Sequence, residues 1–256
     1  MIVLYGLLRL NTQSVAQDMD FELVARPPED FAGAITQIAQ DQQGFIWFAA
    51  ESGLFKYDGQ RYISHTHDPI NTNTPADFKI WGMMLDREGI IWLLPGGFGL
   101  DRFDPVTEKF MHYRHNDNDS TTVSHDQVTA VFEDRDGKLW VGTTAGLDKF
   151  DKTTQTFTHY RNKPDDPNTI SCNQVRVIYE DRQGVMWIGT GNQYDQYPWT
   201  EDHIGGLNKF DKRSGTFTRF THKKGDTTSL ADNRVEALLE DSRGTFWVGR
   251  RTTHVR

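Results

Sequence analysis

Residues 134–151 read DRDGKLWVGTTAGLDKFD, and this stretch decides the fold because variants of it recur along the chain. It begins with a turn from Asp134 to Gly137, continues through an apolar run centred on Trp140, and ends in a short amphipathic run. An Asp at the first position of a turn can cap its own backbone, and a Gly at the fourth position tolerates the required conformation. The stretch therefore predicts short strands joined by tight turns.

The D-x-x-G-x-x-W pattern of this stretch occurs five times. Its members are Asp41, Gly44 and Trp47; Asp86, Gly89 and Trp92; Asp134, Gly137 and Trp140; Asp181, Gly184 and Trp187; and Asp241, Gly244 and Trp247. Successive tryptophans are separated by 45, 48, 47 and 60 residues. We interpret the Asp and Gly as turn residues, and the Trp as a core residue that packs between neighbouring repeats.

A period in the forties with short alternating runs is typical of a propeller-like array. In the third repeat the predicted strands are residues 128–134, 138–143, 146–151 and 156–161. Nothing in the chain requires a helix, so the predicted class is all-β, a β-propeller of four-stranded blades. We expect four full blades and part of a fifth, at residues 35–78, 79–127, 128–174, 175–234 and 235–256.

The composition excludes several classes of partner and site. The net charge of the 256-residue chain is −8 and no Lys/Arg cluster is present, which argues against nucleic acid as a partner. With the single cysteine Cys172, neither an intramolecular disulfide nor a Cys-based zinc site can form. No run is long enough to cross a membrane, and no motif indicates a cofactor.

The N-terminal residues 1–16 look like a truncated signal peptide. The apolar run IVLYGLL (2–8) is followed by SVAQ (14–17), although a basic segment is missing. This pattern favours export, and the alternative is a disordered or buried N-terminal strand. In residues 17–34 we expect a lone outer strand at FELV (21–24).

The fourth repeat carries 13 extra residues between its second and third strands, within the segment GNQYDQYPWTEDHIG at 191–205. Exposed aromatic rings with nearby carboxylates suit sugar recognition, because rings stack on apolar sugar faces and oxygens accept hydroxyl protons. The candidate ligand-binding residues are Tyr194, Asp195, Tyr197, Trp199, Glu201, Asp202 and His203. The competing interpretation is an ordinary surface loop whose aromatic rings cover a neighbouring blade.

Other residues carry weaker signals. Asp134 and Asp136 mimic the start of a calcium loop whose remainder is absent, so no metal site is predicted. The pairs His65/His67 and His112/His115 could bind a metal, but solvated outer-strand histidines are the preferred interpretation. Trp81 departs from the repeat pattern on an inner strand, where it could line the central channel or simply pack.

The repeats resemble the two-component regulator propeller repeat, through D-x-x-G-x-x-W followed by G-L-x-[KR]-[FY]-D and the opening GLFKYDGQRY (53–62). The resemblance covers roughly residues 21–250. It implies seven-bladed propellers in a periplasmic sensor region, followed by a membrane span and a histidine kinase or other output domain. On this basis we expect a non-catalytic fragment of an incomplete seven-bladed propeller. Membrane attachment and any kinase would lie in further C-terminal segments.

The resemblance also implies a small-molecule or glycan ligand and pairing of the chain with itself as a dimer. Two other function classes stay open. One is a propeller enzyme, a lyase or hydrolase with its site on the central channel. The sequence shows no G-x-S-x-G elbow, phosphate loop or H-E-x-x-H. The other is a protein–protein interaction scaffold. A closed propeller of four or five blades is the alternative architecture.

Overall fold

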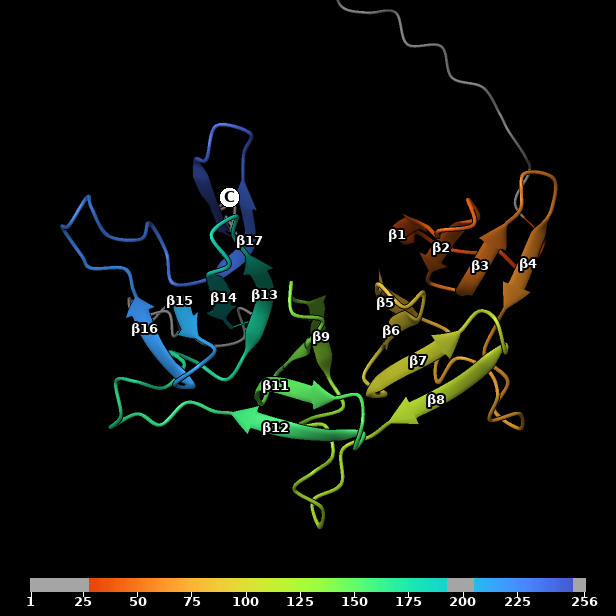
Figure 1. Ribbon diagram of the computed structural model, residues 1–256, viewed down its shortest axis with the longest axis horizontal. Helices are drawn as coiled ribbons and strands as arrows, with labels where there is room; N and C mark the ends of the chain where they lie inside the picture. Colours follow the sequence, from red (N-terminus) through yellow and green to blue (C-terminus); the bar gives the residue numbers. More distant parts are fainter. Residues whose placement is uncertain (1–27, 193–204, 251–256) are drawn as a thin grey trace, which may run out of the picture.

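The computed structural model describes residues 28–192 and 205–250, which form five antiparallel sheets (Figure 1). The first sheet comprises β1 (Ile35–Gln40), β2 (Ile46–Ala50), β3 (Gly53–Tyr57) and β4 (Tyr62–His65). The second comprises β5 (Ile80–Leu85), β6 (Ile91–Pro95), β7 (Leu100–Asp104) and β8 (Lys109–Tyr113). Each is a meander in which sequential strands are hydrogen-bonded neighbours.

The remaining sheets repeat this plan. The third comprises β9 (Val128–Glu133), β10 (Leu139–Thr143), β11 (Gly146–Asp151) and β12 (Thr156–Tyr160). The fourth comprises β13 (Val175–Glu180), β14 (Met186–Gly191), β15 (Gly205–Asp211) and β16 (Thr216–Phe220). The fifth, within the described residues, has β17 (Val235–Glu240) and β18 (Phe246–Arg250). The all-β class, the four full blades with a partial fifth, and the strands of the third repeat are confirmed.

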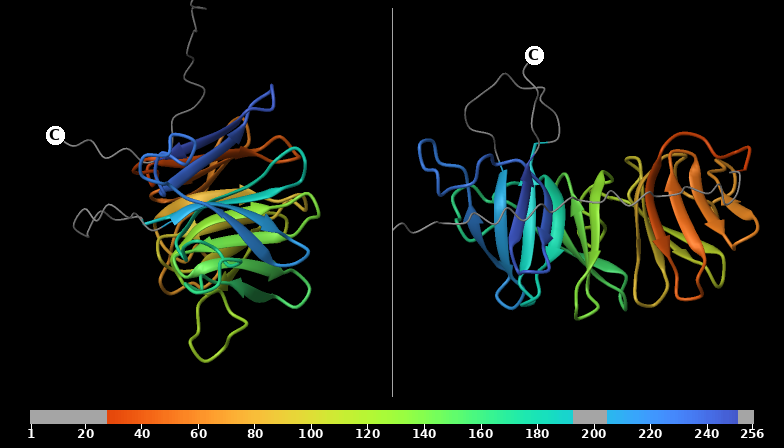
Figure 2. Two further views of the ribbon diagram at one scale, coloured as in Figure 1. Left: turned by 90° about the vertical axis from the view of Figure 1, so that its left-hand side faces the viewer. Right: turned by 90° about the horizontal axis from the view of Figure 1, so that it is seen from above.

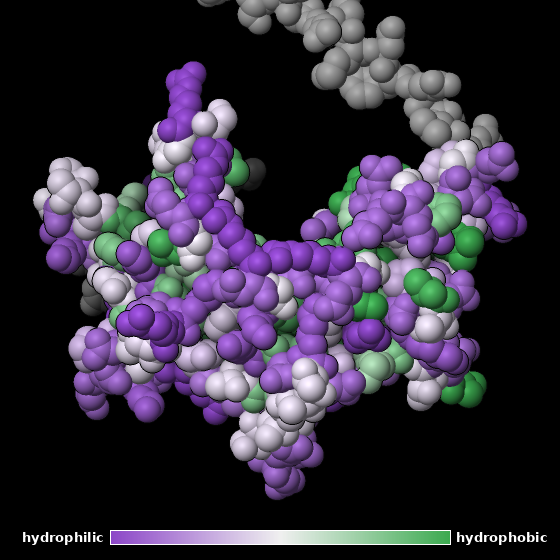
Figure 3. All heavy atoms as spheres, viewed as in Figure 1, coloured by the Kyte–Doolittle hydropathy of each residue, from purple (hydrophilic) through white to green (hydrophobic). Residues whose placement is uncertain are grey.

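The blades stand side by side around an open arc, with the first strand of each blade innermost (Figures 1 and 2). These inner strands contact one another in succession, β1 with β5, β5 with β9, β9 with β13, and β13 with β17. Mainly hydrophilic residues follow the inner rim of the arc (Figure 3). The described part of the chain holds no helix long and apolar enough to span a lipid bilayer.

Because strands alternate in direction, each blade has two distinct ends. We call one end the loop face; it holds the second-to-third loops and the connections between blades. The other end is the turn face, with the first-to-second turns and the third-to-fourth loops. The loop that follows Gly191 in the fourth blade leaves from the loop face.

The repeated aspartate closes the turn between the first two strands of each blade. In the third blade, Asp134 Oδ1 accepts the amides of Asp136 and Lys138 at 3.0 and 2.9 Å, and Oδ2 accepts Trp140 Nε1 at 2.9 Å. The same three bonds recur at Asp41, Asp86, Asp181 and Asp241. The turn glycine has a φ between 73° and 91° in all five copies, a left-handed conformation that favours glycine. The predicted turn roles are confirmed.

The repeated tryptophan lies between blades, as predicted, in the first three blades, whereas Trp247 of the fifth is 58% exposed. Trp47, Trp92 and Trp140 are each 1% exposed. Their rings pack edge-on against a phenylalanine in the third strand of the next blade, at centroid distances of 5.7, 5.4 and 5.2 Å. Edge-to-face contacts of this kind add to the stabilisation from burial alone. The hydrophobic core is therefore a series of interblade layers rather than one central cluster.

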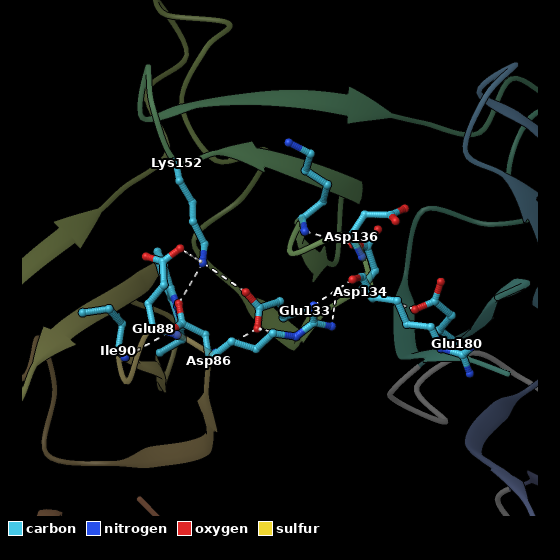
Figure 4. Close-up of polar contacts among 12 residues, drawn as sticks. Asp86, Glu88, Ile90, Glu133, Asp134, Asp136, Lys152 and Glu180 are labelled. Atoms are coloured by element: carbon cyan, nitrogen blue, oxygen red, sulfur yellow. Dashed lines mark hydrogen bonds and ion pairs between the residues drawn. The ribbon is translucent and has the colours of Figure 1, made fainter. Parts of the chain in front are cut away.

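Two lysines join neighbouring blades on the turn face. Lys152 Nζ contacts Asp86 and Glu88 of the second blade at 3.0 and 3.2 Å, and Glu133 of its own blade at 3.1 Å (Figure 4). Lys212 makes the corresponding contacts to Asp134, Asp136 and Glu180 one blade further on, at 3.2, 3.1 and 2.9 Å. Burial lowers the pKa of both lysines, but the hydrogen bonds that they donate to the carboxylates outweigh it and hold each pKa above its usual value.

Candidate ligand site

A β-bulge interrupts the first strand of every blade near the loop face. In the third blade the register passes from Val128 opposite Thr143 to Ala130 opposite Gly142, which leaves Thr129 as the extra residue. The other four first strands have a corresponding register shift, with the extra residue five positions before the turn aspartate; in the second blade the shift spans Trp81 and Gly82. The extra residues are Thr36, Trp81, Thr129, Arg176 and Glu236, which we call the bulge ring. Bulges re-aim side chains and are common beside functional sites.

Two members of the bulge ring tie neighbouring blades together. Thr36 Oγ1 donates to the Ile80 carbonyl at 2.8 Å, and Thr129 Oγ1 donates to the Val175 carbonyl at 2.7 Å. In both cases the acceptor is the first residue of the next inner strand. The other three positions of the bulge ring do not hold threonine. Trp81 contributes an indole, Arg176 a cation and Glu236 an anion. Of these three, Arg176 and Glu236 also join neighbouring blades through their ion pair, whereas Trp81 lies against Gly96 of its own blade.

A cavity of about 600 Å³ lies where the second, third and fourth blades meet at the inner rim, and we call it the axial cavity. Three members of the bulge ring line it, namely Trp81, Thr129 and Arg176. Its other lining residues are Leu94, Pro95, Gly96, Gly97, Gln127 and Val128. All these residues lie near the loop-face ends of their strands, so the cavity opens on the face from which the fourth-blade insertion leaves.

The absence of a side chain at Gly96 leaves room for the tryptophan beside it. A Cβ atom on Gly96 would lie 2.5 Å from Trp81 Nε1 and 3.0 Å from the Asp77 carboxylate. The indole therefore lies against the backbone of the β6–β7 loop, yet Trp81 is 64% exposed. Of the two interpretations of Trp81, the exposed ring on an inner strand favours a place on the central channel over simple packing.

Polar groups in and beside the cavity can both donate and accept hydrogen bonds. Arg176 Nη2 donates to Glu236 Oε1 at 3.2 Å, and this is the one partner of the guanidinium among the described residues. The Gln127 carboxamide has no hydrogen-bond partner among the same residues, and it lines the cavity. An apolar surface with a few convergent polar groups is the usual make-up of a small-molecule site.

The candidate residues of the insertion, Tyr194, Asp195, Tyr197, Trp199, Glu201, Asp202 and His203, lie outside the described residues, and so does the strand expected at 21–24. Their roles stay predictions. The structure does describe where the insertion starts and ends, because Gly191 pairs with Gly205 at the ends of β14 and β15.

The preferred interpretation of the histidines, as solvated outer-strand side chains, holds only in part, because His65 and His112 lie on outer strands but all four histidines are partly buried. His65 packs against Trp47 and Phe103, at centroid distances of 6.1 and 4.8 Å. His67 Nδ1 bonds the Pro75 carbonyl at 2.7 Å, and His115 Nδ1 bonds the Val123 carbonyl at 2.8 Å. Each ring is held by its own neighbours. Within residues 28–192 and 205–250, no group of three His, Cys, Asp or Glu side chains could hold a metal ion.

His112 belongs to a strap that occurs in two blades. Its Nδ1 donates to the buried Asp101 at 2.6 Å, and its Nε2 donates to the Thr72 carbonyl at 2.8 Å. His159 repeats this arrangement with Asp148 at 2.7 Å and the Ser120 carbonyl at 2.9 Å. Because both ring nitrogens face acceptors, both donate and the imidazole is a cation. The ring thereby links the outer strand to the third strand and to the connection between blades. The aspartate bond raises the pKa of both histidines.

These straps predict a pH dependence of stability. A histidine whose pKa is raised on folding stabilises the fold fully below its ordinary pKa of about 6.5, and this contribution is lost as the pH rises through the folded value. As the pH rises from about 6.5 to 9, we expect the free energy of unfolding to fall less in the double variant His112→Gln/His159→Gln than in the wild type. Urea denaturation across this range measures it, with His125→Gln as the control because no ion pair to His125 is present among the described residues. Parallel curves for wild type and double variant would contradict the assignment.

Sequence reasoning missed Arg176, Glu236 and the interblade contacts of Lys152 and Lys212, which we call the lysine clamps. A signal for the first two was present, because aligning the repeats on the turn aspartate places Thr, Trp, Thr, Arg and Glu at one position. The histidine straps also had a signal, since the aspartate and the histidine are 11 residues apart in both blades. The lysine clamps had none, because two of the three carboxylates at each lysine come from another repeat.

Three segments of the chain, residues 122–145, 169–192 and 229–249, match the family model described as two component regulator propeller. Each segment covers the end of a connection between blades and the first two strands of the blade that follows. No curated protein matches the chain. The family match thus agrees with the repeat period and with the blade boundaries on which the bulge ring depends.

Solved structures give the same fold. The extracellular domain of a hybrid two component system from Bacteroides thetaiotaomicron is 22% identical, with a TM-score of 0.50, over 84% of this chain and 38% of its own. YCF48 from Cyanidioschyzon merolae is 12% identical, with a TM-score of 0.55, over 88% of this chain and 66% of its own. This chain therefore spans less than two thirds of either structure.

Proposed function

Because the chain carries two-component regulator propeller repeats, we propose that it is the ligand-sensing, non-catalytic propeller of a receptor in two-component signal transduction. The observation that carries the proposal is the repeat itself, which matches the family model in three blades. The similarity to an extracellular domain of a hybrid two component system supports the fold of such a receptor. Phosphorelay chemistry would belong to a histidine kinase or other output domain outside these repeats.

The proposed ligand is a small nutrient molecule, with a carbohydrate as the leading class. The support is the axial cavity, whose volume of about 600 Å³ is typical of small-molecule sites. The insertion at 191–205 leaves from the same face, and we propose that its aromatic and acidic residues contribute to the site. A ligand held between blades would stabilise their relative positions, which is a means of passing a signal along the chain.

The non-catalytic part of the proposal is supported by how the histidines are used. The ring nitrogens of His112 and His159 are both bonded to structural partners, so neither can exchange a proton with a substrate without breaking its strap. We further propose a periplasmic location, because the N-terminal segment has export features, and pairing of two propellers as the receptor's oligomeric form.

The test separates binding from turnover. The purified chain is screened by thermal unfolding against separate sets of sugars, amino acids and organic acids, and each hit is then incubated with the protein and analysed by chromatography. We expect at least one hit to raise the Tm and to be recovered unchanged. A ligand at one hundred times its Kd stabilises the fold by about 2.7 kcal/mol, which such a screen detects. Conversion of the hit would overturn the non-catalytic assignment, and the absence of any hit would overturn ligand sensing.

A further inference from the structure

We propose that the axial cavity binds a neutral saccharide ring, stacked on Trp81 and hydrogen-bonded by Arg176. The inference rests on the proposed ligand-sensing function and specifies where the ligand binds and what charge it has. It places the primary site at the bulge ring rather than in the insertion. Three lines of observation carry it, namely the exposed indole, the paired charges and an amide that has no partner among the described residues.

The indole of Trp81 is a stacking platform. It occupies a bulge position where the first and third blades have threonine, and it is 64% exposed although it is the largest side chain lining the cavity. Its contact with the backbone at Gly96 limits how far the ring can move. An aromatic ring that is held in place and left open to solvent suits the apolar face of a sugar ring.

The charges around the cavity favour an uncharged ligand. Arg176 is already paired with Glu236 at 3.2 Å, and the Asp77 carboxylate lies beside Gly96 next to the indole. The three groups together carry a net negative charge, so a ligand carboxylate would compete with Glu236 and be repelled by Asp77. Hydroxyl groups meet no such penalty, because each can accept from the guanidinium and donate to a carboxylate.

Two further groups match a polyhydroxylated ligand. The Gln127 carboxamide, without a partner among the described residues, offers one acceptor and two donors. Thr129 lines the cavity, and its Oγ1 uses its proton on the Val175 carbonyl at 2.7 Å, so the hydroxyl can offer a ligand only an acceptor. The volume of about 600 Å³ lies within the range of about 300–1,000 Å³ found for small-ligand sites.

The experiment is calorimetric titration of the purified chain with glucose, galactose, xylose, maltose, cellobiose and lactose, and with glucuronate and galacturonate. The variants are Trp81→Ala, Arg176→Met and Glu236→Gln. Trp247→Ala is the matched control, since it removes an indole that is also exposed, at 58%, but does not line the cavity. Tm and circular dichroism establish that each variant is folded.

We expect a neutral sugar to bind, and Trp81→Ala and Arg176→Met to weaken it at least tenfold, with no change for Trp247→Ala. Glu236→Gln leaves Arg176 uncompensated and should improve uronate binding at least tenfold. A sugar that binds equally well to Trp81→Ala would overturn the inference and leave ligand sensing intact. Uronates binding more tightly than neutral sugars to the wild type would overturn the charge argument. Lack of binding by the whole sugar set would overturn the saccharide site, whereas the proposed function fails only if amino acids and organic acids give no hit either.

Discussion

Trp140→Ala is expected to lower the free energy of unfolding by about 3–5 kcal/mol, the usual cost of removing a buried large aromatic ring. The indole is 1% exposed, packs against the next blade at 5.2 Å between ring centroids, and donates Nε1 to Asp134 at 2.9 Å. Its removal leaves a cavity between the third and fourth blades and takes one hydrogen bond from a buried carboxylate. Chemical denaturation followed by circular dichroism measures the loss.

Trp247→Ala is the matched control for this prediction. Trp247 occupies the same repeat position and makes the same bond to its turn aspartate, Asp241, at 2.9 Å, but its side chain is 58% exposed. We expect a loss of about 1 kcal/mol or less, because the transfer and cavity contributions are largely absent. Equal losses in the two variants would show that the turn bond, rather than interblade packing, accounts for the role of the tryptophan.

Much of the fold follows from local chemistry, and this explains why the repeats could be interpreted from sequence. An aspartate that caps its own turn and a glycine with a positive φ act within four residues, so D-x-x-G predicts a tight turn without knowledge of the rest of the chain. The period then brings each tryptophan to an equivalent place. Because this large residue recurs at one position of the repeat, the sequence predicts that it is buried between blades.

The site could not be predicted in the same way. A bulge is a mismatch between two paired strands, and register depends on both strands together rather than on either sequence alone. Trp81, Thr129 and Arg176 belong to three different repeats, and the arc brings them to one cavity. The sequence signal for exposed aromatics instead pointed to residues 191–205, where composition is unusual but partners are unknown. Similarly, His112 looked solvated because the connection that covers it comes from earlier in the chain.

Asp134→Asn tests how much the turn face contributes to holding the blades together. The side chain is fully buried, and Oδ2 accepts from both Trp140 Nε1 and Lys212 Nζ, at 2.9 and 3.2 Å. An asparagine can keep its carbonyl towards the turn amides, but its NH₂ group then faces an indole N–H and an ammonium group. We expect a loss of about 2–4 kcal/mol, in the range for breaking a buried, hydrogen-bonded ion pair.

The effect of Asp134→Asn should depend on pH and on the lysine. Burial raises the pKa of Asp134, but bonds from Trp140, Lys138 and Lys212 outweigh it and hold the pKa below its ordinary value of 3.8. The carboxylate therefore stabilises the fold fully above pH 3.8, and the contribution is lost as the pH falls through the folded value, so the penalty should shrink in acid. In the Lys212→Met background, Asp134→Asn should lower the free energy of unfolding by less. The reason is that Lys212 Nζ, one of the two donors that would face the asparagine NH₂ group, is then absent.

Asp241→Asn is the control, since Asp241 makes the same turn and indole bonds without a lysine partner among the described residues. We expect a much smaller destabilisation there. A double-mutant cycle of Asp134 and Lys212, measured by denaturation at neutral pH, isolates the coupling between the blades. A coupling energy of zero between Asp134 and Lys212 would mean that the lysine clamps are incidental surface contacts. The interblade tryptophans and the bulge-ring threonines would then be the contacts that fix each blade against the next.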